Sequence, residues 1–179
     1  MKRAIFILPI LGFGLLAFFL FRSLWGRPPE LLPSVLIDKP APTLGLQALE
    51  GSPGFTDADL RAGHVSIVNF FASWCAPCRL EADTLMALSK AKGFTLYGVA
   101  YHDKPADTRQ FLSETGDPFV AIVADLQGLR AIDWGVTAAP ETFVVDGKGV
   151  IRFKYVGQLT DAVVAQQLMP AVATAAQAR

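Results

Sequence analysis

The sequence is poor in charge and in metal-ligating side chains. Charged residues make up 18% of the 179 residues, and no basic run is longer than two residues. The chain therefore lacks the basic footprint of a nucleic-acid-binding protein, and we exclude that class. A metal site takes about four ligands. The two histidines, His64 and His102, stand at spacings from the two cysteines that do not suit one. No metal or cofactor is predicted, and neither histidine is assigned a role.

Apolar residues, in contrast, are abundant. They form 52% of the sequence, enough to bury a sizeable core, and the length suits one domain with a modest extension. The formal charge of zero hides an asymmetry, because all sixteen acidic residues follow position 27. Four of the sixteen basic residues precede position 28, so residues 28–179 carry twelve basic and sixteen acidic residues, a net charge of −4.

An uncharged run of eighteen residues, from Ala4 to Phe21, lies close to the N-terminus. It has about the minimum length for a helix to cross a bilayer. A cleaved signal peptide would have a shorter apolar region and a cleavage site of small residues, and a buried core helix would have a polar face. We therefore predict an uncleaved membrane anchor over residues 1–25. The N-terminus would lie inside, the globular part outside the cytoplasm, and Trp25 at the outer headgroups.

The remainder divides into a linker and one domain. Residues 26–42 contain five prolines, which predicts an extended tether that is stiffer than a Gly/Ser linker. Residues 43–179 form the predicted domain. Apolar and β-branched runs predict strands at 65–71, 94–100, 119–123, 141–145 and 150–155. Helical patterns cover 75–91, 107–114, 126–134 and 161–178.

The order of these elements predicts an α/β layer fold, a central mixed sheet flanked by helices on both faces. The helix at 75–91 joins two buried strands, and such a βαβ unit has a right-handed crossover. The sequence of residues 146–149, Asp-Gly-Lys-Gly, predicts a hairpin between the last two strands.

The two cysteines stand together, as Cys75-Ala76-Pro77-Cys78, where a buried strand turns into a helix. Free N–H groups and the helix dipole at this position favour an anion, so the Cys75 thiol should lose its proton easily. Cys78 lies one helical turn further on, close enough to attack a mixed disulfide formed by Cys75. Pro77 is tolerated in the first turn because no backbone N–H is needed there.

A Cys-x-x-Cys pair beside a βαβ pattern is a strong redox signal. A purely structural disulfide over two intervening residues would close too small a loop to stabilise the fold much. Two spectator thiols would suit the cytosol but not an oxidising compartment. We therefore predict thiol–disulfide exchange, with Cys75 as nucleophile and Cys78 as resolving cysteine.

With a strand, Trp74-Cys75-Ala76-Pro77-Cys78, a helix and a later proline, the chain resembles the thioredoxin superfamily. The 135–143 segment (Gly-Val-Thr-Ala-Ala-Pro-Glu-Thr-Phe) and the 144–149 segment (Val-Val-Asp-Gly-Lys-Gly) resemble the membrane-anchored CcmG/DsbE thiol–disulfide oxidoreductases of cytochrome c biogenesis. The Cys78-Arg79-Leu80-Glu81 run, residues 97–101 and residues 115–119 are also similar to that family. The resemblance covers about residues 39–158. It implies a thioredoxin-like fold.

The resemblance also implies a substrate-binding surface. Pro140 would be a cis-proline that faces the cysteines and presents backbone to an incoming substrate chain, a conformation which its place before a strand and hairpin favours. Trp74, Pro77 and Ala139 would line the same surface.

Two carboxylates are candidates for moving the proton. Thioredoxin has a buried aspartate six residues before its first cysteine, and here that position is Asn69, whose amide neither accepts nor delivers a proton as a carboxylate does. The candidates are Glu81, one turn after Cys78, and Glu141, next to Pro140. The alternatives are a helix-face carboxylate paired with Arg79 or near Lys90 for Glu81 and an exposed strand-edge charge for Glu141. The sequence leaves the choice between the two open.

The resemblance implies that both carboxylates lie in an acidic groove around the cysteines. Negative charge near Cys75 would raise its pKa and make the pair prefer the disulfide. The chain would then be a reductant, on the reducing side of a scale where thioredoxin stands at about −270 mV.

The resemblance implies a protein-disulfide reductase in the bacterial inner membrane, single-pass, with its domain in the periplasm. Its substrate would be the Cys-x-x-Cys-His cysteines of apocytochrome c, reached directly or through haem-ligation maturation proteins. Electrons would come from a transmembrane thiol carrier of the DsbD/CcdA kind. The alternatives are a TlpA-like reductase for copper-site cysteines of cytochrome oxidase and a redox-independent chaperone for apocytochrome. A thiol peroxidase, which would need a lone peroxidatic cysteine, ranks lowest.

Overall fold

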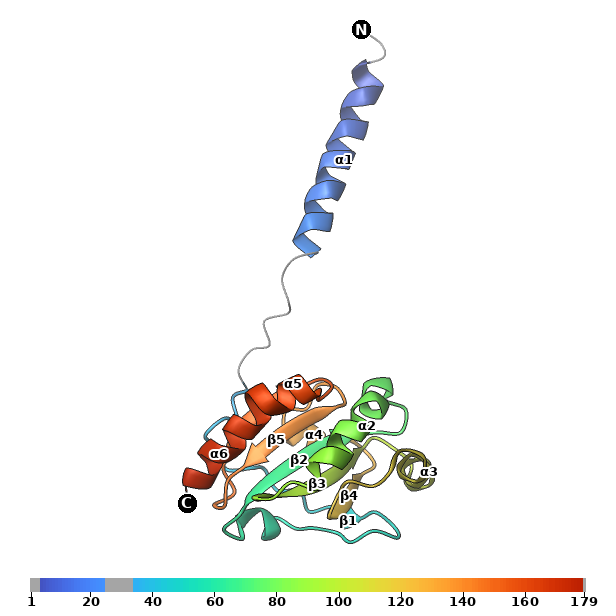
Figure 1. The fold of residues 1–179 in the computed structure, drawn as a ribbon. Helices are drawn as coiled ribbons and strands as arrows, with labels where there is room; N and C mark the ends of the chain where they lie inside the picture. The colour runs from blue at the N-terminus through green and yellow to red at the C-terminus, as the bar shows by residue number, and fades with distance from the viewer. Residues whose placement is uncertain (1–3, 25–33, 179) are drawn as a thin grey trace. The chain divides into compact units, whose positions relative to one another are not determined.

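The computed structural model describes residues 4–24 and 34–178, and the chain divides into two units at Pro33 and Ser34 (Figure 1). In the first unit, helix α1 (Ala4–Leu24) covers the run for which an anchor is predicted. Among the described residues, no helix is long and apolar enough to span a bilayer. Trp25 and the part of the predicted tether up to residue 33 lie outside the described residues.

The second unit is built on a six-stranded mixed sheet with the order β1-β4-β3-β2-β5-β6. The three parallel strands are β2 (Val65–Phe71), β3 (Phe94–Tyr101) and β4 (Ala121–Asp125). The antiparallel strands are β1 (Gln47–Ala48), β5 (Glu141–Val145) and β6 (Ile151–Val156). The five predicted strands are confirmed within two residues. Strand β1 has two exposed residues and left no pattern in the sequence.

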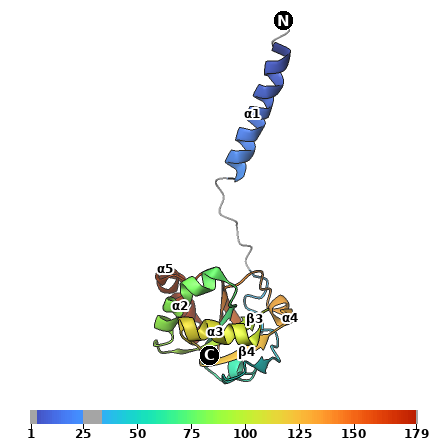
Figure 2. The same cartoon turned by 90° about the vertical axis from the view of Figure 1, so that its right-hand side faces the viewer.

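Helices cover both faces of this sheet, as predicted (Figures 1 and 2). Side chains of α2 (Ala76–Leu88) and α6 (Met169–Gln177) pack with one face of β2 and β5, and α3 (Pro105–Thr115) packs beside α2. The other face packs with α4 (Leu129–Asp133), the short helix η1 (Asp59–Arg61) and Trp134, which follows α4. Strand β2, whose seven residues are all buried, is therefore covered on both sides.

The last predicted helix, 161–178, is helical throughout, but its hydrogen-bond pattern changes within it. It consists of α5 (Asp161–Val163), the π-helical turn η2 (Val164–Leu168) and α6. Pro170 lacks the N–H that a continuous α-helix would need, and a π turn before it accommodates the missing bond. Thr160 caps the start by accepting the N–H of Val163 at 3.3 Å.

Residues 34–42, which the sequence assigns to the tether, pack against the domain. Pro40 forms a β-bridge with Val150. Asp38 N donates to Ile151 O and Ala41 N to Gly149 O, both at 2.8 Å. This segment therefore lies along the β5–β6 hairpin and belongs to the compact unit that begins at Ser34.

Candidate functional site: a disulfide at a helix N-terminus

The two cysteines lie at the N-terminus of α2. Cys75 is the N-cap, with extended backbone, and its Sγ accepts the N–H of Cys78 at 3.1 Å. The cysteines form a disulfide and are only 3% and 2% exposed. Pro77 lies exposed in the first turn. In the reduced protein the same N–H and the helix N-terminus favour the Cys75 thiolate.

The loop before Cys75 is held by the segment that follows β3. Ser73 donates from its backbone N and from its hydroxyl to the carboxylate of Asp103, at 2.7 and 2.8 Å. Asp103 also accepts the Thr108 hydroxyl at 2.8 Å, so it joins the redox loop to the first turn of α3. The buried Asp103 carboxylate is thus hydrogen-bonded both to the loop before Cys75 and to α3.

Trp74 is fixed by a backbone group. Its indole N–H donates to the carbonyl of His102 at 3.0 Å, and its ring lies 6.2 Å from that of Tyr101. His102 has a φ of 48°, which is uncommon for a residue with a side chain. The side chain of Trp74 remains 58% exposed, so a rigidly held aromatic surface stands beside the disulfide.

The Ala139–Pro140 peptide bond is cis, as the resemblance implied. Ala139 packs against the apolar cluster that contains Cys75 and Cys78. Pro140 is buried, and its carbonyl accepts the N–H of Gly157 at 2.9 Å. The structure thus brings the proline loop to the disulfide from the other end of the chain.

Glu141 is fully buried and anchors this loop. Its Oε1 accepts the backbone N and the hydroxyl of Thr137, both at 2.7 Å, and the N–H of Ala138 at 3.2 Å. Its Oε2 forms an ion pair with Lys154 Nζ at 2.8 Å, without the alignment of a hydrogen bond. Lys154 also donates to the carbonyl of Gly135. The carboxylate of Glu141 is therefore occupied in holding residues 135–140 in place, and it is not an exposed edge charge.

Glu81 is also fully buried, but in a different environment. Its Oε1 accepts Asn69 Nδ2 at 3.1 Å, and its Oε2 accepts the N–H of Leu159 at 2.7 Å. Burial raises the pKa of Glu81 to about 7, and these two hydrogen bonds offset only part of the effect. Glu81 and Cys78 line the same small cavity, which has room for about one water molecule. A carboxyl group that titrates near neutrality thus lies beside the resolving cysteine.

The two carboxylates lie on opposite faces of the sheet. Asn69 pairs with Thr142 across β2 and β5, and their side chains are hydrogen-bonded on the face that α2 covers. The next register pair is Phe70 with Glu141, and successive residues of a strand point to opposite faces. Only Glu81 shares a face and a cavity with Cys78.

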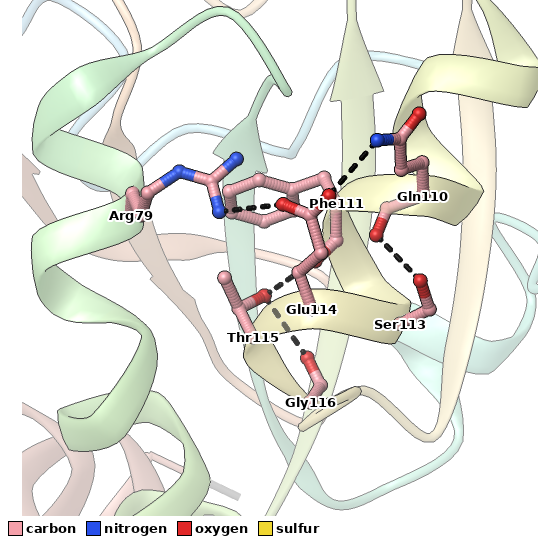
Figure 3. A network of polar contacts seen from close by, with 7 residues as sticks. All are labelled: Arg79, Gln110, Phe111, Ser113, Glu114, Thr115 and Gly116. Carbon is pink, nitrogen blue, oxygen red and sulfur yellow. Dashed lines mark hydrogen bonds and ion pairs between the residues drawn. The ribbon is translucent and has the colours of Figure 1, made fainter.

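Arg79, directly after the second cysteine, has a different partner from the one considered in the sequence. Its guanidinium lies 2.9 Å from Glu114 Oε2 and stands over the ring of Phe111, 5.1 Å from its centre (Figure 3). Gln110 donates to the other oxygen of Glu114 at 2.9 Å. Arg79 therefore joins α2 to α3, and it does not pair with Glu81.

Three residues of this arrangement were missed in the sequence: Asp103, Lys154 and Leu159. Lys154 alternates with apolar residues along β6, as Arg152 does, and this is the pattern of a solvent-facing side, so the sequence carries no signal of its buried partner. Asp103 has the pattern of a residue that begins a helix. Leu159 contributes its backbone N–H, which has no signature in a sequence.

The site supports exchange between thiols and disulfides. It combines an N-capping cysteine, a second cysteine one turn on, an exposed tryptophan and a cis-proline loop. In the described ranges, no group of three or more His, Cys, Asp or Glu residues is placed to hold a metal ion.

Known proteins share the fold and the sequence. Residues 37–168 match the Redoxin family. The thiol:disulfide interchange protein HelX of Rhodobacter capsulatus is 40% identical over 97% of this chain and 98% of its own length. A DsbE homologue of Paracoccus denitrificans, also a thiol:disulfide interchange protein, is 49% identical over 73% of this chain and 72% of its own. The crystal structure of a thioredoxin-family thiol:disulfide interchange protein from Chlorobium tepidum matches with a TM-score of 0.59 and 26% identity, over 82% of this chain and 99% of that one.

Proposed function

Because this chain belongs to the Redoxin family and to the DsbE/HelX (CcmG) thiol:disulfide interchange proteins, and is a thiol–disulfide oxidoreductase, we propose that it is a membrane-tethered reductase of cytochrome c biogenesis. The observation that carries the proposal is the Cys75–Cys78 pair at the start of α2, with the cis-proline loop packed against it. The substrate is the oxidised Cys-x-x-Cys-His pair of an apocytochrome c, or a cysteine of a haem-ligation maturation protein.

The reaction has two displacement steps. The Cys75 thiolate attacks one sulfur of the substrate disulfide, and the other substrate sulfur leaves as a thiolate and takes up a proton. The thiolate of Cys78 then attacks Cys75 Sγ in the mixed disulfide and releases the second substrate sulfur. Two electrons pass from the enzyme to the substrate, and the enzyme is left with the Cys75–Cys78 disulfide.

Glu81 handles the proton of Cys78 in this proposal. Its ionised carboxylate accepts the thiol proton of Cys78 through the shared cavity, directly or through one water molecule. When a donor re-reduces the disulfide, Cys78 leaves as a thiolate and Glu81 returns the proton. A group with a pKa of about 7 suits both directions near neutral pH. Glu141 instead positions Ala139 and Pro140, where substrate backbone docks.

Compartment and tether complete the proposal. Haem attachment needs two free thiols, and an oxidising periplasm removes them, so a reductant must act there. The apolar side chains of α1 support a tether to the inner membrane, since Phe13, Leu15, Phe18 and Phe19 are all exposed. Electrons reach the periplasmic domain from a transmembrane thiol carrier of the DsbD/CcdA kind. The reduction potential of the Cys75–Cys78 pair lies on the reducing side of the scale on which thioredoxin stands at about −270 mV.

The test is a trap in the native host. A Cys78→Ser variant keeps the nucleophile but cannot resolve the mixed disulfide, so the substrate stays attached to Cys75. Mass spectrometry should find Cys75 linked to the Cys-x-x-Cys-His cysteines of apocytochrome c or to its maturation partners. The matched control, Cys75→Ser, should capture none of these proteins. Capture of copper-site proteins in their place would refute the substrate, and an empty trap would refute the reductase.

A further inference from the structure

Asn69 occupies the centre of the polar cluster beneath the disulfide. It is fully buried on β2, and its Nδ2 donates to two oxygens, Glu81 Oε1 at 3.1 Å and Thr142 Oγ1 at 3.0 Å. Its own Oδ1 has no hydrogen-bond partner. A buried acceptor without a partner costs free energy, so this atom needs an explanation.

The two partners of Asn69 share a chemical property. An ionised carboxylate only accepts hydrogen bonds, but a protonated carboxyl group also donates one, and a hydroxyl group can do either. When Glu81 gains a proton, its Oε1–H and the Thr142 hydroxyl can both become donors. A half-turn of the Asn69 carboxamide then brings Oδ1 to the position of Nδ2, where it accepts both bonds, and the NH₂ group takes the position without a partner, so one end of the amide is unpaired in either orientation.

We propose that Asn69 is a positioning residue that holds Glu81 in both protonation states by this half-turn of its side-chain amide. The inference rests on the proposed role of Glu81 as proton carrier for Cys78. The amide itself neither gains nor loses a proton. It keeps the carboxyl group fixed beside Cys78 whichever form is present, so the proton can pass without a rearrangement of the backbone.

The other groups around Glu81 show why Asn69 has this positioning role. The groups that face Glu81 are Cys78 on its own helix, Asn69 on β2, Thr142 through Asn69 on β5, and the Leu159 N–H. Of these, Cys78 is the titratable one, and the remaining lining of the cavity is apolar apart from Thr115. In the part of the chain that the structure describes, no basic side chain contacts Glu81. The Leu159 N–H can only donate, so it cannot follow the proton.

The residue type fits this task and excludes the obvious substitutes. An aspartate at position 69 would place a second carboxylate about 3 Å from Glu81, and the two could not both ionise. A leucine would fill similar space but offer neither a donor nor an acceptor. Asparagine alone among residues of this size offers an N–H and a carbonyl on the same planar group.

The first test uses the full-chain oxidised protein, labelled with nitrogen-15 and carbon-13, over roughly pH 5 to 9. The Asn69 side-chain NH₂ resonances should titrate with the same midpoint as the Glu81 carboxyl carbon. In Glu81→Gln the Asn69 titration should disappear, and in the control Ser66→Ala, another buried polar residue of β2, it should be unchanged. If Glu81 titrates while the Asn69 resonances do not move, or if they move equally in Glu81→Gln, the inference is wrong.

A second test uses Asn69→Leu and Asn69→Asp. Asn69→Leu removes a partner of both forms of Glu81, so the Glu81 midpoint should move by less than about half a pH unit, whereas Asn69→Asp places a second carboxylate beside Glu81 and should raise the midpoint by more than about one unit. A rise of about one unit or more in a folded Asn69→Leu variant would show that Asn69 stabilises only the ionised form, and it would overturn the inference. The proposed function has a separate readout, the rate at which a dithiol reduces the Cys75–Cys78 disulfide. If Glu81→Gln leaves that rate unchanged, the proton role of Glu81 fails whatever Asn69 does.

Discussion

Replacing Glu81 by glutamine should make the protein more stable at high pH while it slows the reaction. Glutamine resembles the neutral acid in shape, but its one acceptor oxygen can take the hydrogen bond from Asn69 or from the Leu159 N–H and not both. Because burial raises the pKa of Glu81 to about 7, the folded protein binds this proton more tightly than the unfolded chain does. The free energy of unfolding of the wild type should therefore fall as pH rises from about 4.5 to about 7, and Glu81→Gln should lack this fall.

The structure gives the magnitude. A pKa of about 7 in place of the ordinary 4.5 corresponds to about 3 kcal/mol, at 1.36 kcal/mol per pH unit. Below pH 4.5 Glu81→Gln should be less stable than the wild type by about 1 kcal/mol, because one hydrogen bond is lost, and above pH 7 it should be more stable by about 2 kcal/mol. With an m-value of about 2 kcal/mol per molar urea, the midpoint of Glu81→Gln at high pH should exceed that of the wild type by about 1 M. Loss of the proton carrier should slow the resolving step by about a hundredfold or more.

Urea unfolding of the oxidised full-chain proteins at roughly pH 4 and pH 8 measures this difference. Glu50→Gln is the control, because the Glu50 side chain is 82% exposed and should not change the pH profile. The reasoning is refuted if the difference between wild type and Glu81→Gln is the same at both pH values, since Glu81 would then have the same pKa in the folded and unfolded states.

Three further substitutions have expected outcomes. Lys154→Met should destabilise the protein by about 3 kcal/mol, because it leaves the buried carboxylate of Glu141 unpaired, and should raise KM more than it lowers kcat; an unchanged urea midpoint would contradict this. Asp103→Ala should lower the free energy of unfolding by about 2 kcal/mol and change the fluorescence of Trp74. An unaltered spectrum would show that the hydrogen bonds from Ser73 to Asp103 do not hold the loop before Cys75. Arg79→Ala should change stability by less than about 1 kcal/mol in denaturant unfolding, since its ion pair with Glu114 is half-exposed.

Local features of the fold could be predicted because their signals are short-range. The largely apolar strand β2, the proline in the first turn of α2 and the Asp-Gly-Lys-Gly hairpin each depend on neighbouring residues. Where distant segments decide, prediction failed. Nothing in residues 34–42 indicates that they pair with the β5–β6 hairpin, and the two exposed residues of β1 have no pattern.

The sequence alone determined the chemistry of this protein. Two cysteines three positions apart at a strand-to-helix junction lie on one turn of a helix, so their reactivity follows from local geometry. The division of labour between Glu81 and Glu141 was decided only by the tertiary structure. Alternation along β5 separates Glu141 from Thr142, but which face α2 covers depends on packing across the whole sheet. The pKa of Glu81 is raised because the fold buries its carboxyl group, and the hydrogen bonds from Asn69 and the Leu159 N–H offset only part of this effect. Glu141 becomes an anchor because Lys154 reaches it on the other face of the sheet.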